Sequence, residues 1–254
     1  MALRTVFVGL VAILSTAISP ASAGPFDAWA AIVVAGDYRA HSGAPSEVFD
    51  NARRDLVKAL KQIGFAENNI QHYSVQPERD PDTHPMRSDA QAIHDNFKTL
   101  AQKAPAGCFV YVTSHGAPLG IVMGETLIPL RAVGDIVDDA CSNRPTVVII
   151  SACFSGMFIP VLHNDNRMIL TAARPDRTSF GCGEANQYTF FDQCILESLP
   201  MSQNFPGLAD KARECVAARE MAEMATPPSE PQLYMGSAVA ALLKSANFTS
   251  NGGP

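Results

Sequence analysis

A cysteine and a histidine stand at matching places in two similar stretches of the sequence. Cys153 follows shortly after the β-branched run Val147–Ile150, and His115 follows a second apolar run, Cys108–Thr113. Such runs are typical of strands buried on both faces of a parallel sheet. An imidazole beside a thiol helps to form the reactive thiolate and later returns a proton to the leaving group. The sequence therefore predicts a catalytic Cys153–His115 pair at the carboxyl edge of a sheet.

Main-chain donors for an oxyanion are predicted beside this pair. Gly116 lacks a side chain where a substrate carbonyl would approach, and its N–H and that of Cys153 are the expected donors. Losing one such donor costs roughly 3 kcal/mol of transition-state stabilisation. Taken singly, Cys153 could be a buried structural thiol and His115 a hydrogen-bonded loop residue. Taken together, each closing a β-branched strand, they favour catalysis, and His163 is an alternative base.

The elements that must position this pair alternate along the chain. Besides the two strands above, strands are predicted at 28–35, 70–75, 168–173 and 232–235, and a hairpin at 120–130 that turns at Gly124-Glu125. Helices are predicted at 46–63, at 130–140, at 188–199, at 206–225, at 237–244, and from Ser88, which forms a capping box with Gln91. This order predicts one α/β domain over 24–245, with a mostly parallel sheet of about six strands and helices on both faces. The segment 206–225 is interpreted as packing or as a regulatory cap.

The two ends of the chain differ from this pattern. Residues 1–23 have the features of an export signal: Arg4, an apolar stretch at 6–18, and the small-residue site Ala21-Ser22-Ala23. An uncleaved anchor is the alternative, although the apolar part is short for a membrane span. We therefore expect a periplasmic or extracellular protein without membrane contact after cleavage. The tail 246–254 is predicted to be disordered.

The six cysteines fit an exported protein in which disulfides persist. If Cys153 is free, the other five cannot all pair, and Cys108, inside an apolar strand, is expected to be a buried thiol. Cys141, Cys182, Cys194 and Cys215 remain, with three possible connectivities, and bridges among the last three are favoured.

Several classes of function are disfavoured by composition and spacing. The net charge of −6 disfavours nucleic acid as a partner. No grouping of histidine, cysteine and carboxylate has metal-ligand spacing, so no metal or other cofactor is expected. A redox role is disfavoured because the chain has no Cys-x-x-Cys. The four histidines not yet mentioned are expected to face solvent: His41, His72, His84 and His94.

The stretches Thr113–Gly116 (Thr-Ser-His-Gly) and Ser151–Gly156 (Ser-Ala-Cys-Phe-Ser-Gly) resemble the two motifs of the legumain family of cysteine peptidases, within the wider caspase–haemoglobinase group. The resemblance covers roughly 30–199 and continues through Thr171–Cys182. It implies a three-layer caspase-like sandwich. It also implies an exported or, in a eukaryote, lysosome-type endopeptidase that hydrolyses peptide or protein substrates through the cysteine and histidine of these motifs.

The same resemblance assigns Ser179 and Asp192 to the primary specificity pocket. Two departures stand against asparaginyl specificity. Legumains have an Arg-His pair where this chain has Phe49-Asp50-Asn51-Ala52, and an acid where this chain has Phe154. Asp192 without a basic counterpart suggests a basic P1 residue, and its alternative role is that of an ordinary solvated or capping acid.

Two other functions share the expected fold. A catalytically silent caspase-like scaffold that binds peptides is kept open by the altered pocket. Transamidase or transpeptidase activity would use the same acyl-enzyme and differ only in the group that accepts the acyl chain. Intact His115 and Cys153 favour hydrolysis over the silent scaffold.

Overall fold

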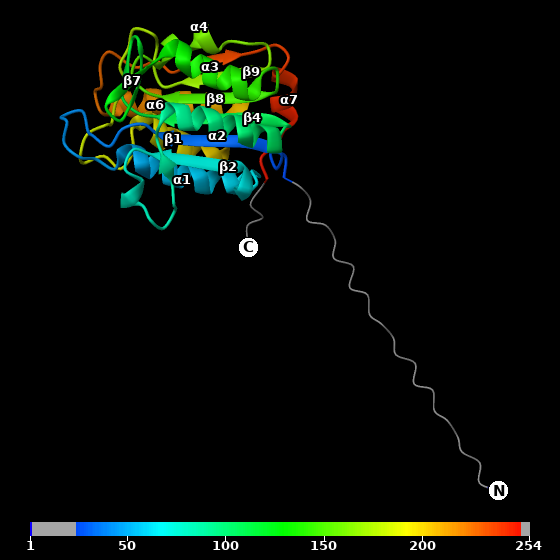
Figure 1. The fold of residues 1–254 in the computed structure, drawn as a ribbon. Helices are drawn as coiled ribbons and strands as arrows, with labels where there is room; N and C mark the ends of the chain where they lie inside the picture. The colour runs from blue at the N-terminus through cyan, green and yellow to red at the C-terminus, as the bar shows by residue number, and fades with distance from the viewer. Residues whose placement is uncertain (2–23, 250–254) are drawn as a thin grey trace.

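A seven-stranded sheet forms the centre of the protein in this computed structural model (Figure 1), which describes residues 24–249 and Met1. The predicted export signal and residues 250–254 lie outside the described residues. The strand order is β10-β9-β8-β4-β1-β2-β3, and every neighbouring pair is parallel except β10 with β9. The strands are β1 (Trp29–Ala35), β2 (Ile70–Ser74), β3 (Met86–Arg87), β4 (Gly107–Thr113), β8 (Thr146–Ser151), β9 (Arg167–Thr171) and β10 (Gln232–Met235).

Helices cover both faces of the sheet, so the prediction of a three-layer, mostly parallel α/β fold is confirmed. One face is covered by α2 (Ala90–Lys103), α3 (Leu130–Cys141) and α4 (Ile159–Leu162). The other is covered by α1 (Val48–Gln62), α5 (Phe190–Ser198), α6 (Phe205–Ala222) and α7 (Ala240–Ser245). Short 3-10 helices occur at Glu67–Asn69, Pro77–Arg79, Ser155–Phe158 and Leu199–Met201. No helix in the described part of the chain is both long and apolar enough to span a membrane.

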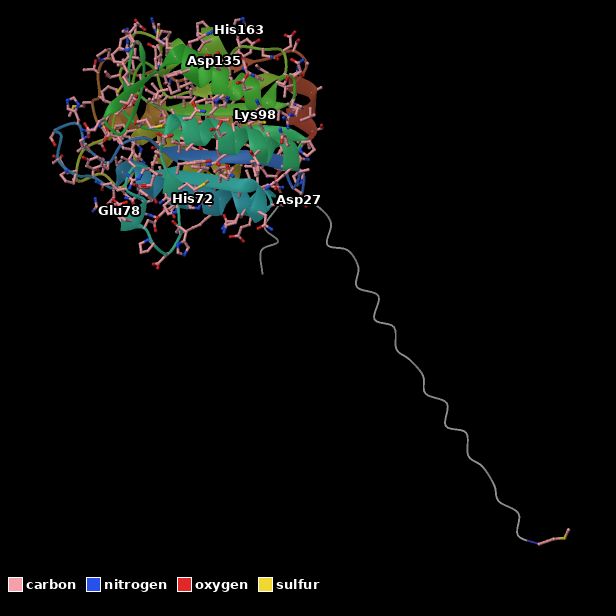
Figure 2. The ribbon with its side chains drawn as sticks, viewed as in Figure 1. Asp27, His72, Glu78, Lys98, Asp135 and His163 are labelled. Carbon is pink, nitrogen blue, oxygen red and sulfur yellow. A yellow bond between two sulfur atoms is a disulfide. The ribbon has the colours of Figure 1, made fainter. Side chains whose placement is uncertain are left out.

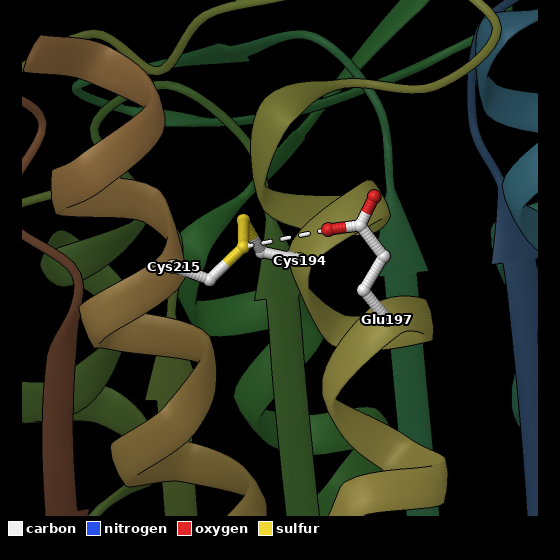
Figure 3. A group of neighbouring side chains, drawn as sticks. All are labelled: Cys194, Glu197 and Cys215. Carbon is white, nitrogen blue, oxygen red and sulfur yellow. Dashed lines mark hydrogen bonds between the residues drawn. A yellow bond between two sulfur atoms is a disulfide. The ribbon is translucent and has the colours of Figure 1, made fainter. Parts of the chain in front are cut away.

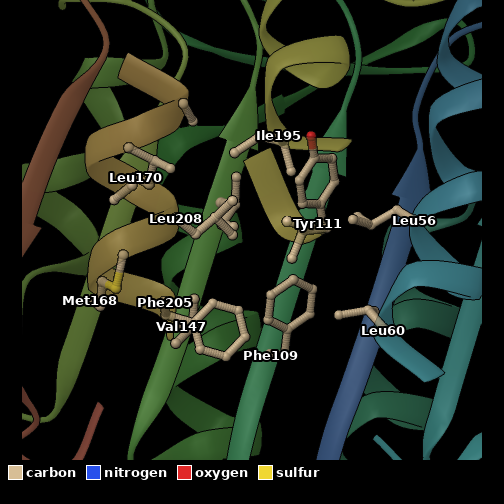
Figure 4. Close-up of a cluster of buried hydrophobic side chains, with 14 of the residues drawn as sticks. Leu56, Leu60, Phe109, Tyr111, Val147, Met168, Leu170, Ile195, Phe205 and Leu208 are labelled. Carbon is tan, nitrogen blue, oxygen red and sulfur yellow. The ribbon is translucent and has the colours of Figure 1, made fainter. Parts of the chain in front are cut away.

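Strand alternation explains why the central strands are apolar throughout. In β4, Phe109 and Tyr111 pack with α1, α5 and α6 (Figure 4), whereas Val110 and Val112 pack under α2 and α3. All residues of β4 and β8 are buried. Since each large apolar side chain contributes about 1.5–3 kcal/mol when buried, the two faces fix the register of these strands.

A second, small sheet begins at the residue after His115. It consists of β5 (Gly116–Ala117), β6 (Gly120–Met123) and β7 (Thr126–Pro129), paired antiparallel. The hairpin predicted at 120–130 is confirmed, and Gly124 supplies the positive φ of 62° that its turn requires.

Three local expectations were wrong. The segment between the strand predicted at 70–75 and the helix predicted from Ser88 contains the short strand β3, which was not expected, so the sheet has seven strands instead of about six. The N-cap of α2 is Asp89, which accepts a hydrogen bond from Ala92 N at 2.8 Å, because the Ser88 hydroxyl instead donates to Ala35 O. At the C-terminus the segment 247–249 is packed: the Phe248 ring lies 5.0 Å from that of Phe205.

Two disulfides are formed, Cys108–Cys141 and Cys194–Cys215. The expectation that Cys108 is a free thiol was wrong, because alternation in β4 turns its side chain to the face covered by α3, whose last residue is Cys141. The second bridge ties α5 to α6, with Glu197 beside it (Figure 3). These two sulfurs are bonded to each other, so they are not thiolate ligands for a metal.

Candidate active site

His115 follows β4 and is held by its ring nitrogen and by one ring face. Its Nε2 lies 3.0 Å from the Arg39 carbonyl oxygen. Because a carbonyl only accepts, Nε2 carries the proton and Nδ1 is left to take one up. Phe49 packs edge-on against the imidazole, with ring centroids 5.1 Å apart. The Arg39 guanidinium is itself clamped by Asp37 at 3.0 Å and by Glu125 at 3.1 Å, so the loop that orients His115 is fixed to the neighbouring hairpin.

Cys153 follows β8 at a sharp turn. Its Sγ accepts a hydrogen bond from Ser179 N at 3.3 Å, and the Ser179 hydroxyl lies 3.7 Å away. The next residue, Phe154, has a left-handed backbone with φ of 57°, an unusual conformation for a bulky residue. Phe154 N donates to Arg177 O at 2.7 Å, which helps to hold this turn. The turn aims the sulfur out of the sheet toward the segment that carries Ser179.

Gly116 marks where the loops carrying His115 and Cys153 touch. A Cβ at this position would stand 2.2 Å from the Cys153 carbonyl oxygen and 2.9 Å from the Ala152 Cβ. The absence of a side chain at this position therefore permits close approach of the two loops. Cys153 N has no hydrogen-bond partner among residues 24–249, which suits an oxyanion donor.

One cleft of about 930 Å³ brings these groups together. Its lining includes His115, Gly116, Cys153 and Ser179. Their common position follows from the register of the sheet, because Thr113 and Ser151, each two residues before a predicted catalytic residue, are direct partners on neighbouring parallel strands.

The cleft also contains residues that sequence reasoning did not assign to a site. His41 comes from the loop after β1, and its main-chain N–H donates a hydrogen bond to Cys182 O at 3.0 Å. Burial, and then the charge of Cys153, raise the pKa of the Cys182 thiol. Arg219 and Glu223 come from the end of α6. Arg219 and Glu223 are four residues apart, so they lie on the same face of the helix, and this spacing is the only signal in the sequence that connects them.

The segment predicted at 206–225 both packs and forms a wall of the cleft. Its helix α6 is bridged to α5 by a disulfide. The Arg219 guanidinium lies over the Phe190 ring at 5.6 Å and pairs with Glu197 at 3.4 Å. These contacts fix the α6 wall relative to the sulfur and the imidazole.

A model of the peptidase C13 family matches residues 33–204, about two thirds of the sequence. The chain belongs to the peptidase C13 family. The crystal structure of caspase-1 from Spodoptera frugiperda is similar in fold, with a TM-score of 0.60 and 16% identity over 90% of this chain and 94% of that chain. At this identity the likeness shows the fold alone. No curated protein matches the chain significantly.

In this C13 peptidase-family chain, Asp192 does not join the other predicted site residues. It is fully buried, absent from the cleft lining, and accepts hydrogen bonds from the hydroxyls of Tyr111 and Thr113, both at 2.6 Å. Burial raises the pKa of its carboxyl group, and these hydrogen bonds oppose that rise. The hypothesis of a basic P1 residue therefore loses its physical basis, since the carboxylate does not face the cleft.

The alternative base and the remaining histidines lie away from the cysteine. His163 is exposed at the outer surface beyond α4 (Figure 2), with its ring 6.1 Å from that of Tyr234. His94 pairs with Asp139 at 2.9 Å, and His84 is exposed. His72 was wrongly expected to face solvent: it is half-buried, and burial lowers its pKa to about 4.

Proposed function

We propose that this member of the C13 family is an exported cysteine endopeptidase that hydrolyses peptide bonds through Cys153 and His115. The observation that carries the proposal is the shared cleft, in which both residues lie with Gly116 at the ends of neighbouring strands. A scaffold that only bound peptides would not need a sulfur and an imidazole in one groove.

The chemistry follows from the groups present. The Cys153 thiolate attacks the carbonyl carbon of the substrate while the N–H groups of Cys153 and Gly116 hold the oxyanion. His115 donates its proton to the leaving amine, the C–N bond breaks, and an acyl-thioester remains. His115 then takes a proton from water as the water oxygen attacks the thioester; the C–S bond breaks, and the carboxylic acid leaves while the Cys153 thiolate and the His115 imidazolium are restored. The Arg39 carbonyl keeps the imidazole oriented throughout.

Substrate contacts are proposed along the segment 179–182, on the groups that its own fold leaves open. The carbonyl oxygens of Phe180 and Cys182 already accept hydrogen bonds from within the protein. Phe190 N donates to Phe180 O, and His41 N donates to Cys182 O. Gly181 N and O have no backbone partner among the described residues, so both groups remain available to hydrogen-bond a peptide substrate. An exported location is supported by the two disulfides and by the features of residues 1–23.

A peptide library with mass-spectrometric detection tests this function. We expect cleavage by the wild type under mild reducing conditions, loss in Cys153→Ala and His115→Ala, and retention in His163→Ala, whose side chain lies outside the cleft. Peptide binding without cleavage by the wild type would support the silent scaffold instead. Products extended by an added amine would support transamidation.

A further inference from the structure

Asp192 is a fully buried acid in the first turn of α5, outside the lining of the cleft. Both of its carboxylate oxygens are hydrogen-bonded, one by the Tyr111 hydroxyl and the other by that of Thr113, each at 2.6 Å. Both partners belong to β4, and Thr113 is two residues before His115. Two residues of a strand span about 7 Å, so the carboxylate is tied to the strand just below the imidazole.

A second branch of the same network reaches the strand of Cys153. The Thr189 hydroxyl caps α5 by accepting from Asp192 N at 3.1 Å, and it lies 3.3 Å from the Ser151 hydroxyl. Ser151 is two residues before Cys153 and is the direct strand partner of Thr113. Asp192 thus links α5 to the ends of both strands that carry the reactive groups, to β4 through its carboxylate and to β8 through its main-chain N–H and Thr189.

Stability alone does not require an acid at this position. A buried carboxylate is costly unless it is paired with a cation, and no lysine, arginine or histidine forms an ion pair with Asp192 within the described part of the chain. Thr189 already supplies the cap of α5. An amide of the same shape would accept a hydroxyl without the cost of burying a charge.

We propose that Asp192 is a positioning residue for the reactive pair: it fixes the ends of β4 and β8 relative to each other, and with them the His115 ring and the Cys153 sulfur. This role rests on the proposed peptidase function. It differs from substrate recognition, because Asp192 acts through Thr113 and Ser151 and does not contact the cleft.

The test measures how fast iodoacetamide alkylates Cys153 as a function of pH, by mass spectrometry of the peptide that contains it, in the full-length protein. His115→Ala defines the profile of the thiol without its imidazole. We expect Asp192→Asn to shift the profile toward that reference and to lower the rate at neutral pH at least tenfold. With a cleaved peptide, kcat is expected to fall by more than KM rises.

A matched control is Asp80→Asn. Asp80 is likewise buried and accepts from a hydroxyl, that of Thr83 at 2.7 Å, but its partners lie outside β4 and β8. This variant is expected to lose stability and keep the wild-type profile. If Asp192→Asn also keeps the wild-type profile and kcat, the network is structural only and the proposed role is wrong.

Two milder variants decide the matter if Asp192→Asn does not fold. Thr113→Val and Tyr111→Phe each remove one donor, and Thr113→Val is expected to shift the alkylation profile more, since Thr113 lies closer to His115 along the strand. If the two variants shift the alkylation profile equally, or not at all, Asp192 does not have the proposed positioning role. If the wild-type protein has the same alkylation profile as His115→Ala, the imidazole does not act on Cys153 and the proposed function itself is wrong. This outcome is distinct from one in which only the role of Asp192 is wrong.

Discussion

Replacing Gly116 by alanine perturbs the contact between the two loops that carry the reactive groups. The new Cβ would stand 2.2 Å from the Cys153 carbonyl oxygen, about 0.8 Å inside the 3.0 Å below which real Cβ contacts essentially never occur. The nearest atoms are backbone and the Cβ of Ala152, so no flexible side chain can swing away. The loops must therefore separate by roughly 1 Å.

Such a displacement has a calculable consequence for catalysis. A misplacement of about 1 Å can cost about 10²-fold in rate, or roughly 2.7 kcal/mol of transition-state stabilisation. Overpacking costs a further 1–3 kcal/mol or so of folding stability. We therefore expect Gly116→Ala to fold, to lose about 100-fold in kcat/KM on a cleaved peptide, and to unfold at lower urea concentration.

The assay pairs peptide cleavage with urea denaturation and includes a matched glycine. At Gly207, in the first turn of α6, a Cβ would lie 3.3 Å from the Asn204 Oδ1, so Gly207→Ala is expected to keep near wild-type activity. Wild-type kcat/KM and stability in Gly116→Ala would contradict the close approach of the two loops.

Three further changes test the fold around the site. Replacing Cys194 and Cys215 together by alanine removes a bridge spanning 21 residues and should lower the free energy of unfolding by about 3 kcal/mol in urea; an unchanged value would mean that the bridge does not form. Burial lowers the pKa of His72 to about 4, so the unfolded chain binds the extra proton and stability falls as the pH drops from about 6.5 to 4. His72→Asn should flatten that slope in thermal unfolding, whereas the exposed His163→Asn should preserve it. Phe248→Ala should cost about 1–3 kcal/mol, and a cost below about 0.5 kcal/mol would contradict the packing of the C-terminal segment.

The positions of His115 and Cys153 could be predicted because they depend on local signals. Each ends a run of β-branched or apolar residues, and the carboxyl ends of parallel strands meet at one edge. The hairpin at Gly124 was predictable for a similar reason, since its turn chemistry is contained in neighbouring residues. These features require no knowledge of distant contacts.

Other features depend on contacts between segments far apart in the chain. Cys108 and Cys141 are paired because α3 covers one face of β4, and a strand's alternation does not say which helix covers which face. Asp192 looked like a pocket acid because its position in the chain matches one, yet hydroxyls on β4 surround it. Arg219 enters the cleft only because α6 folds back over α5.

Because the two disulfides occupy four of the cysteines, the remaining free thiols can report on access to the cleft. Of its six cysteines, only Cys153 and Cys182 are free, and both line the cleft. In the absence of reductant, the rate at which a colorimetric thiol reagent reacts with the protein therefore measures only how accessible the cleft is. Because burial raises the pKa of Cys182, that thiol should react slowly with the reagent at neutral pH, and an inhibitor bound in the cleft should block the reaction of both cysteines.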